Sequence, residues 1–198
     1  VALDWEEVIP FMEWTIIPYW SINLFYVATL FFNASPKDVD RTAKRYLTCQ
    51  LIAVFCFIVF PLRAIFDKPD TSGLTGFMFD ALGSFDKPFN QAPSLNIALL
   101  VVIWHHWRAR FDGWMLWLWH IWAALIGLSV LTTFQHHIMD IPTGALLGLF
   151  ALWLFPEEQS PAGAGPVETR RWKIGGFYVA GSLLFLALSI LTMSASPL

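Results

Sequence analysis

The sequence predicts an all-α membrane protein, a bundle of six transmembrane helices. Of its 198 residues, 57% are hydrophobic and 17% aromatic, but only 14% are charged. A soluble domain carries about 25% charged residues, so this chain has too little charge to coat a water-facing surface. A net charge of −3, with no basic tract among the 12 Lys and Arg residues, argues against nucleic-acid binding.

Six stretches are apolar and long enough, or nearly so, to cross a bilayer, which takes about 20 helical residues. They are residues 14–32, 46–62, 94–107, 114–131, 138–155 and 174–192. The third is short, but Pro93 suits the first position of a helix, and the long side chain of Arg108 can extend the span by snorkelling. We therefore expect one integral membrane domain over residues 1–198, with its core at 14–155.

Two segments outside these spans have patterns of their own. In residues 73–85, apolar side chains recur at helical spacing around the single charged residue Asp80, which predicts a short helix lying in the outer membrane interface. It either merely covers the bundle or forms a rim past which a lipid headgroup slides. Residues 156–172, which are rich in Pro, Gly, Ser and Glu at their start, read as a flexible linker to the last span.

Positive charges set the expected orientation, because cytoplasmic loops carry the excess of Lys and Arg. Alternate loops divide all 12 cations into nine on one side and three on the other. The nine are Lys37, Arg41, Lys44, Arg45, Arg108, Arg110, Arg170, Arg171 and Lys173. The three are Arg63, Lys68 and Lys87, so the loops of residues 63–92 and 132–137 are expected outside the cytoplasm, in a plasma (inner) membrane.

A polar cluster stands at the outer mouth of the fifth span, where ionisable residues are costly and therefore candidate sites. It consists of Gln135, His136, His137 and Asp140. His136 and Asp140 are four residues apart, so on a helix they share one face. The carboxylate can then accept a hydrogen bond from one ring nitrogen and leave the other as a nucleophile or base. The simpler interpretation is a structural hydrogen bond.

Two further features are predicted on the same outer side. Ser94 begins the third span, and a helix N-terminus is a ready anion site because its N–H groups are unpaired. Arg63 and Lys68 follow the second span. Cations, a helix N-terminus and an oriented histidine in one layer suit a phosphate group, both as bound charge and as the group under attack.

These motifs, in this order, resemble the type 2 phosphatidic acid phosphatase superfamily. They are Arg63-x-x-x-x-Lys68-Pro69, then Ala-Pro-Ser-Leu-Asn at 92–96, then Ser-Val-Leu-Thr-Thr-Phe-Gln-His-His-Ile-Met-Asp at 129–140, followed by Gly144 and Gly148. The chain looks closest to the branch related to inositol phosphorylceramide and sphingomyelin synthases, some of whose bacterial members are fused to a dual-specificity phosphatase domain. The resemblance covers roughly residues 14–155 and implies one more helix before the motifs than we count.

The resemblance implies a membrane-embedded histidine that attacks a lipid phosphate, forming a phosphohistidine that water or an alcohol resolves. His136 would be the nucleophile, Asp140 its orienting carboxylate, and Ser94 a ligand of the phosphate oxygens. Arg63 and Lys68 would replace the cations of the first motif, although their spacing is two residues shorter than the family pattern. The arginine expected six residues before the histidine is Val130 here, so Gln135 or His137 would supply that phosphate ligand.

The second motif departs further, because Asn96 stands where the family has histidine. That histidine would protonate the departing lipid alkoxide, and such acid catalysis contributes about 10²–10⁴-fold. Asparagine can hydrogen-bond but cannot deliver a proton near neutral pH. Asn96 is therefore either an inactivating change made to capture substrate or a natural divergence toward binding, and we expect an impaired enzyme.

The expected function is cleavage or transfer of the phosphate group of a phospholipid or lipid phosphate, without metal or cofactor, on the extracytoplasmic side. Its partners would be the lipid substrate, bilayer lipids and a fused or separate soluble phosphatase domain. One alternative is a non-catalytic lipid-phosphate binder. Another is a metal or haem site formed by His105, His106 and His120 near the inner ends of two spans; the default for these histidines is hydrogen bonding to backbone or headgroups.

Overall fold

The computed structural model describes residue 6 and residues 8–33, 35–62, 68–85 and 91–157. Within these ranges the chain forms six α-helices and no strand, so the predicted all-α class is confirmed there. The helices are α1 (Ile16–Phe31), α2 (Pro36–Val59), α3 (Gly73–Phe85), α4 (Leu95–Arg108), α5 (Gly113–Thr132) and α6 (Asp140–Leu154), and a 3-10 turn, η2 (Glu13–Thr15), precedes α1. Arg63, most of the predicted linker and the predicted span at 174–192 lie outside the described residues.

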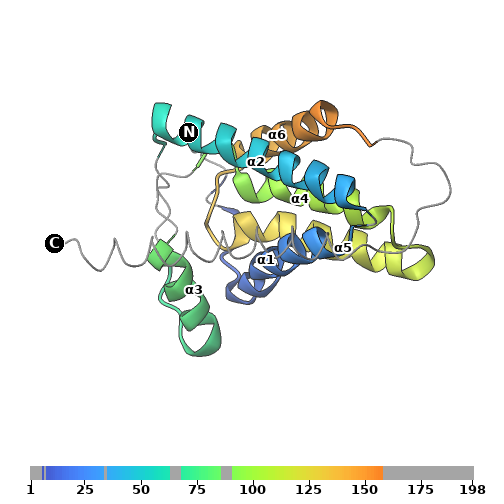
Figure 1. Ribbon diagram of the computed structural model, residues 1–198. Helices are drawn as coiled ribbons and strands as arrows, with labels where there is room; N and C mark the ends of the chain where they lie inside the picture. Colours follow the sequence, from blue (N-terminus) through green and yellow to red (C-terminus); the bar gives the residue numbers. More distant parts are fainter. Residues whose placement is uncertain (1–5, 7, 34, 63–67, 86–90, 158–198) are drawn as a thin grey trace.

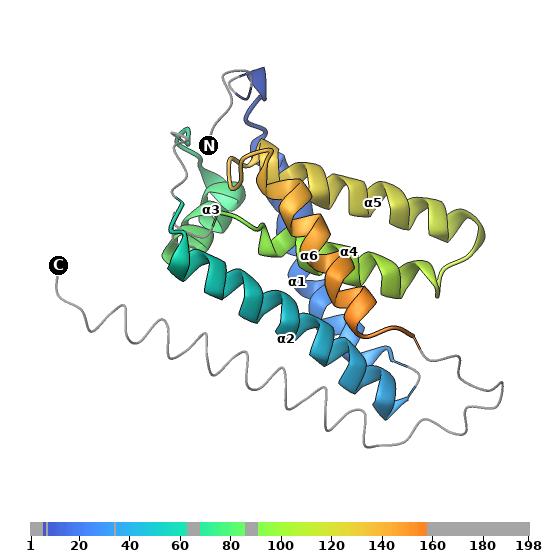
Figure 2. The same cartoon turned by 90° about the horizontal axis from the view of Figure 1, so that it is seen from above.

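Helix α4 occupies the centre of the bundle. It packs against α1, α2, α5 and α6, whereas α3 stands at one end of the bundle and contacts α1 (Figures 1 and 2). The most buried apolar side chains include Val102 and Ile103 of α4, Tyr46 of α2 and Ile126 of α5. The core is therefore built around α4, which also carries the second predicted motif at its first turn.

By length and composition, two helices of the described part could cross a membrane, namely α2 with 24 residues and α5 with 20. Three further helices of the bundle are shorter than these two, with 16 residues in α1, 14 in α4 and 15 in α6. The helices coincide with five of the six predicted spans, and α3 matches the predicted helix at 73–85 at both ends. Within the described residues the structure thus shows an all-α bundle, and two of its helices are candidate membrane spans.

The predicted start of the second span was ten residues late. Helix α2 begins at Pro36, because the Ser35 hydroxyl accepts a hydrogen bond from the Asp38 amide and Pro36 occupies the first helical position. A serine cap followed by proline is a strong start signal. The hydropathy pattern missed it because the first ten residues of α2 carry all of its charged side chains.

Helices α4 and α6 approach each other closely along a pair of glycines. A Cβ atom on Gly148 would lie 2.6 Å from the Ala98 carbonyl oxygen and 2.7 Å from Val101 Cβ, and one on Gly144 would collide with the Ser94 carbonyl. Glycines four residues apart allow this backbone approach, as in many membrane helix pairs. The close contact fixes the N-terminal turns of α4 and α6 side by side.

Candidate functional site

The candidate site lies at the end of the bundle where α4 and α6 both begin. The Ser94 amide donates a hydrogen bond to the Asp140 carbonyl at 3.2 Å, which joins the two first turns directly. Ser94, Gln135, His136, His137 and Asp140 are all buried. Two motifs that are more than 30 residues apart in the sequence are therefore brought together, as predicted.

The histidines sit in a tight turn between α5 and α6. The Val130 carbonyl accepts hydrogen bonds from the amides of both Gln135 and His136, each at 3.1 Å, so the chain reverses at once after α5. Phe134 takes the left-handed backbone conformation there, with φ of 54°, at a cost of about 1–2 kcal/mol for a non-glycine residue. Its ring packs on that of Phe11, with centroids 5.3 Å apart, which helps to hold the turn.

His136 faces Asp140, but not from a helix. The distance between His136 Nδ1 and Asp140 Oδ2 is 3.5 Å, and the two residues are 6% and 4% exposed. The expectation that they share a helical face was wrong, because His136 lies in the turn and α6 begins only at Asp140. Among the described residues His136 Nδ1 makes no hydrogen bond, so the ring lies next to the carboxylate without the predicted hydrogen bond to it.

The Asp140 carboxylate also holds the turn itself. Its Oδ2 accepts a hydrogen bond from the His137 amide at 2.9 Å. The same oxygen thus faces His136 and caps the backbone that precedes α6. A negative side chain at this first turn is stabilised by the positive end of the helix dipole.

Glu6 is a member of the site that the sequence did not indicate. Its Oε2 lies 2.7 Å from His137 Nδ1, and its Oε1 accepts a hydrogen bond from the Ile138 amide at 2.9 Å. Glu6 and His137 are 2% and 3% exposed, so this is a buried ion pair when the imidazole is protonated. His137, predicted as a phosphate ligand, therefore has one ring nitrogen engaged by Glu6.

The first turn of α4 presents Ser94 and Asn96. The Ser94 hydroxyl oxygen accepts a hydrogen bond from the Ile97 amide at 3.4 Å as the N-cap of α4, and its own O–H remains a possible donor. Asn96 Nδ2 donates to the Tyr19 hydroxyl oxygen of α1 at 2.5 Å. Position 96 is thus tied to α1, in the first turn that meets Asp140.

The other predicted phosphate ligands are Gln135, Lys68 and Arg63, and the structure describes only the first two. Gln135 is buried, and its Nε2 makes no hydrogen bond among the described residues, so it can serve as a donor to an anion. Lys68 is exposed in the segment that leads into α3. Arg63 lies outside the described residues, so the expectation that both cations face His136 stays a prediction.

The histidines at the opposite end of the bundle have separate partners. His120 Nδ1 accepts a hydrogen bond from the Trp104 indole at 2.9 Å, and His105 Nδ1 lies 3.5 Å from Glu157 Oε1. In the described ranges no group of three His, Cys, Asp or Glu side chains is placed to hold a metal ion. Among the described residues His105 Nδ1 and His106 Nε2 are buried without a hydrogen-bond partner, so only His120 shows a ring hydrogen bond of the predicted kind, and it goes to an indole instead of to backbone or a headgroup.

Comparisons with protein-family models, with curated proteins and with solved structures found no match for this chain.

Proposed function

We propose that this chain is a membrane-embedded lipid phosphatase or phosphotransferase of the type 2 phosphatidic acid phosphatase kind, impaired by asparagine at position 96. The observation that carries the proposal is the buried pairing of His136 with Asp140 directly against the first turn of α4. A buried imidazole beside a carboxylate can attack a phosphate, and the N–H groups of a nearby helix start can stabilise the charge that develops on it.

In the proposed reaction, His136 Nε2 attacks the phosphorus atom while Asp140 faces Nδ1. A P–N bond forms and the P–O bond to the lipid breaks, so the lipid leaves as an alkoxide that needs a proton. Water or an alcohol then attacks the phosphohistidine, forming a new P–O bond and releasing His136. Ser94 and Gln135 are the described side chains that can bind the phosphate oxygens, with Arg63 and Lys68 as the proposed cations. The reaction requires no metal or cofactor.

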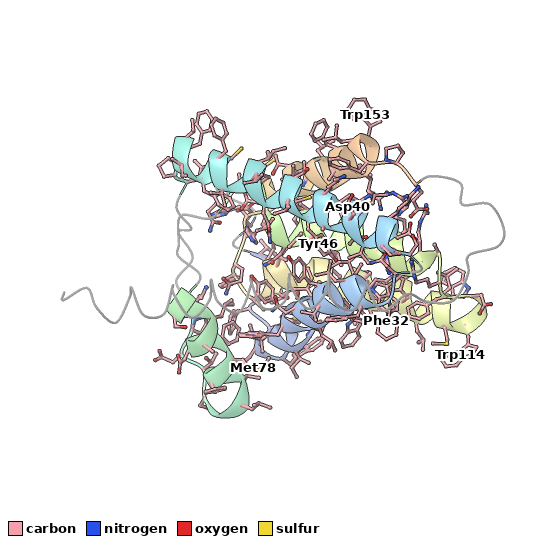
Figure 3. The ribbon with its side chains drawn as sticks, in the orientation of Figure 1. Phe32, Asp40, Tyr46, Met78, Trp114 and Trp153 are labelled. Atoms are coloured by element: carbon pink, nitrogen blue, oxygen red, sulfur yellow. The ribbon has the colours of Figure 1, made fainter. Side chains whose placement is uncertain are left out.

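The proposed membrane setting is supported by the outer surface of the bundle. Large apolar side chains are exposed on three helices: Leu51, Phe55 and Ile58 on α2, Trp117, Ile121 and Leu128 on α5, and Leu146, Leu149 and Trp153 on α6. In Figure 3, Trp114 and Trp153 point away from the bundle. Soluble monomers rarely expose apolar patches of this extent, whereas lipid tails would cover them. We propose six spans in the plasma (inner) membrane, with the site on its extracytoplasmic face.

The proposal is tested by restoring the acid with Asn96→His. We expect the rate of phosphate release from a lipid phosphate such as phosphatidic acid to rise about 10²–10⁴-fold, because an imidazole can protonate the alkoxide. An aryl phosphate, whose phenolate leaves readily, should gain far less. Purified protein and an inorganic-phosphate assay suffice for both substrates.

The matched control is His136→Gln in the Asn96→His protein, which should lose turnover of both substrates. Equal gains on the two substrates would contradict the leaving-group role of position 96. Absence of turnover on every lipid phosphate would instead favour the second candidate function, a non-catalytic lipid-phosphate binder. One observation favours that candidate: Asn96 is held by the Tyr19 hydroxyl and has no acidic proton to give.

A further inference from the structure

A second polar site lies at the other end of the bundle, between the start of α2 and the end of α6. It is a hollow of about 350 Å³ lined by Lys37, Asp40, Arg41 and Lys44 of α2 on one side and residues 154–156 on the other. The first wall is charged, and the second is Leu-Phe-Pro. Figure 3 shows nitrogen-rich side chains gathered at this end of α2, near the labelled Asp40.

The hollow carries a net positive charge, and two of its cations can bind an added anion. Lys44 Nζ pairs with Asp40 at 2.6 Å and Arg41 with Asp38 at 3.1 Å, while Lys37 is exposed and forms no ion pair with the described residues. Three cations against two carboxylates leave one positive charge in excess. The Lys44–Asp40 pair has both side chains more than half exposed, and such pairs contribute little to stability, so Lys44 can turn to another anion at small cost.

The apolar wall of the hollow is fixed by a buried arginine. Arg45 is 4% exposed, and its Nε and Nη2 donate to the Phe155 carbonyl at 3.0 and 2.7 Å. These two bonds satisfy a carbonyl at the end of α6 and hold residue 155 against α2. The hollow is therefore a built feature with one rigid wall.

The position of the hollow relates it to the membrane. Helix α6 runs from Asp140 at the candidate site to Leu154 at the hollow, a rise of about 21 Å, so the two sites lie at opposite ends of the bundle. Trp153, next to the hollow, is 73% exposed, and indole rings favour the membrane interface. All the cations of the hollow belong to the side with the positive excess.

We propose that this hollow binds the phosphate-bearing headgroup of an anionic phospholipid in the cytoplasmic leaflet. Lys37, Arg41 and Lys44 would contact the phosphate, and the acyl chains would run along the exposed apolar side of α6 beyond Trp153. The apolar wall favours a lipid over a free phosphate ion. The proposal rests on membrane insertion but not on the chemistry proposed at His136.

The test is lipid retention by the full-length protein, measured by native mass spectrometry after incubation with phosphatidylglycerol or phosphatidylcholine. Wild type should retain phosphatidylglycerol preferentially. Each basic residue near an anionic lipid surface contributes about five-fold. Removing three of them should therefore reduce retention by the triple variant Lys37→Gln, Arg41→Gln, Lys44→Gln by about 100-fold. The matched control for Lys37→Gln is Arg108→Gln, since Arg108 is an exposed cation of the same predicted side that does not line the hollow, and this variant should retain the lipid.

Three results would overturn the proposal: equal losses in Lys37→Gln and Arg108→Gln, no loss in the triple variant, or displacement of the lipid by millimolar inorganic phosphate. If the triple variant does not fold, the single change Lys37→Gln carries the test, because this side chain is exposed and makes no ion pair with its described neighbours. A loss of about five-fold is expected. Lipid retention is measured without any catalytic turnover. A protein that shows no phosphatase activity can therefore still confirm lipid binding at this hollow.

Discussion

At the scale of single residues, Glu6 connects the start of the chain to the candidate nucleophile. Its carboxylate holds the His137 ring and the Ile138 amide, the His137 amide holds Asp140, and Asp140 faces His136. A continuous series of polar contacts therefore runs from Glu6 to His136. Buried polar groups arranged in this way are costly to leave unsatisfied, so the carboxylate matters for the geometry of the turn.

The first residue-scale prediction concerns this carboxylate. Glu6→Ala should lower the free energy of unfolding by about 2–4 kcal/mol, because it leaves the buried His137 imidazole and the partly buried Ile138 amide without their acceptor. Glu6→Gln, which keeps an acceptor oxygen for the Ile138 amide, should cost less. Thermal or denaturant unfolding in detergent, followed by circular dichroism, measures both.

Asp80→Asn is the matched control, since Asp80 is exposed on α3, and it should change stability by less than about 0.5 kcal/mol. If Glu6→Ala and Asp80→Asn changed the free energy of unfolding equally little, the buried contacts of Glu6 would not contribute to stability.

The sequence predicted part of this site and missed part of it for a definite reason. The spacing of His136 and Asp140 correctly indicated a contact, although through a turn instead of a helix. Glu6 was missed because its contact with His137 spans 131 residues, and local spacing contains no information about such a pairing. Tyr19, which accepts from Asn96 across 77 residues, was missed for the same reason.

At the scale of elements, the pairing of α4 with α6 decides whether the site forms. One predicted motif ends in the first turn of α4, and the other ends at Asp140, the first residue of α6. The glycine contacts fix how closely the two helices approach. Gly144 and Gly148 were noted in the sequence for their helical spacing, but their partner helix could not be read from it. Apolar runs located the helices well, whereas the charged start of α2 escaped the hydropathy pattern.

Gly148→Ala is the element-scale prediction. The added methyl group would meet backbone and Cβ atoms of α4 at 2.6–2.7 Å, and neither can move without shifting the helix. We expect a loss of about 1–3 kcal/mol in the free energy of unfolding, typical of overpacking, together with weaker phosphate release in the Asn96→His background.

The control substitution is Gly127→Ala on α5, where a Cβ would lie 3.6 Å from Leu100 Cδ2, an ordinary contact. There alanine should be neutral or stabilise by up to about 1 kcal/mol through its helix propensity. If Gly148→Ala and Gly127→Ala proved equally stable, the packing of α4 against α6 would not require glycine at position 148.

At the scale of the whole molecule, the bundle has an apolar outer surface and two chemically different ends. One end holds the buried histidines and carboxylates, and the other holds Lys37, Arg41, Lys44 and the buried Arg45. The asymmetry of charge was visible in the sequence because loops alternate between sides. Which polar residues meet at each end depends on long-range packing and required the structure.

The whole-molecule prediction is that Asp80 and Asp112 lie on opposite sides of the membrane. Both are exposed, the first on α3 and the second before α5. In a chain with Cys49→Ala and Cys56→Ala, a membrane-impermeant maleimide should label Asp80→Cys in intact cells and Asp112→Cys only after permeabilisation. Labelling of both from the same side would refute the proposed topology.

The contacts that Glu6, Phe11 and Met12 make with the turn before α6 also have a practical consequence for anyone shortening or tagging this protein. Glu6, Phe11 and Met12 fasten to the turn that carries His136, through His137, Phe134 and the Thr132 carbonyl. A truncated form that starts after Glu6, or an affinity handle fused tightly to that end, would loosen the nucleophile without touching it. Loss of activity in such a form would then be mistaken for a poor preparation.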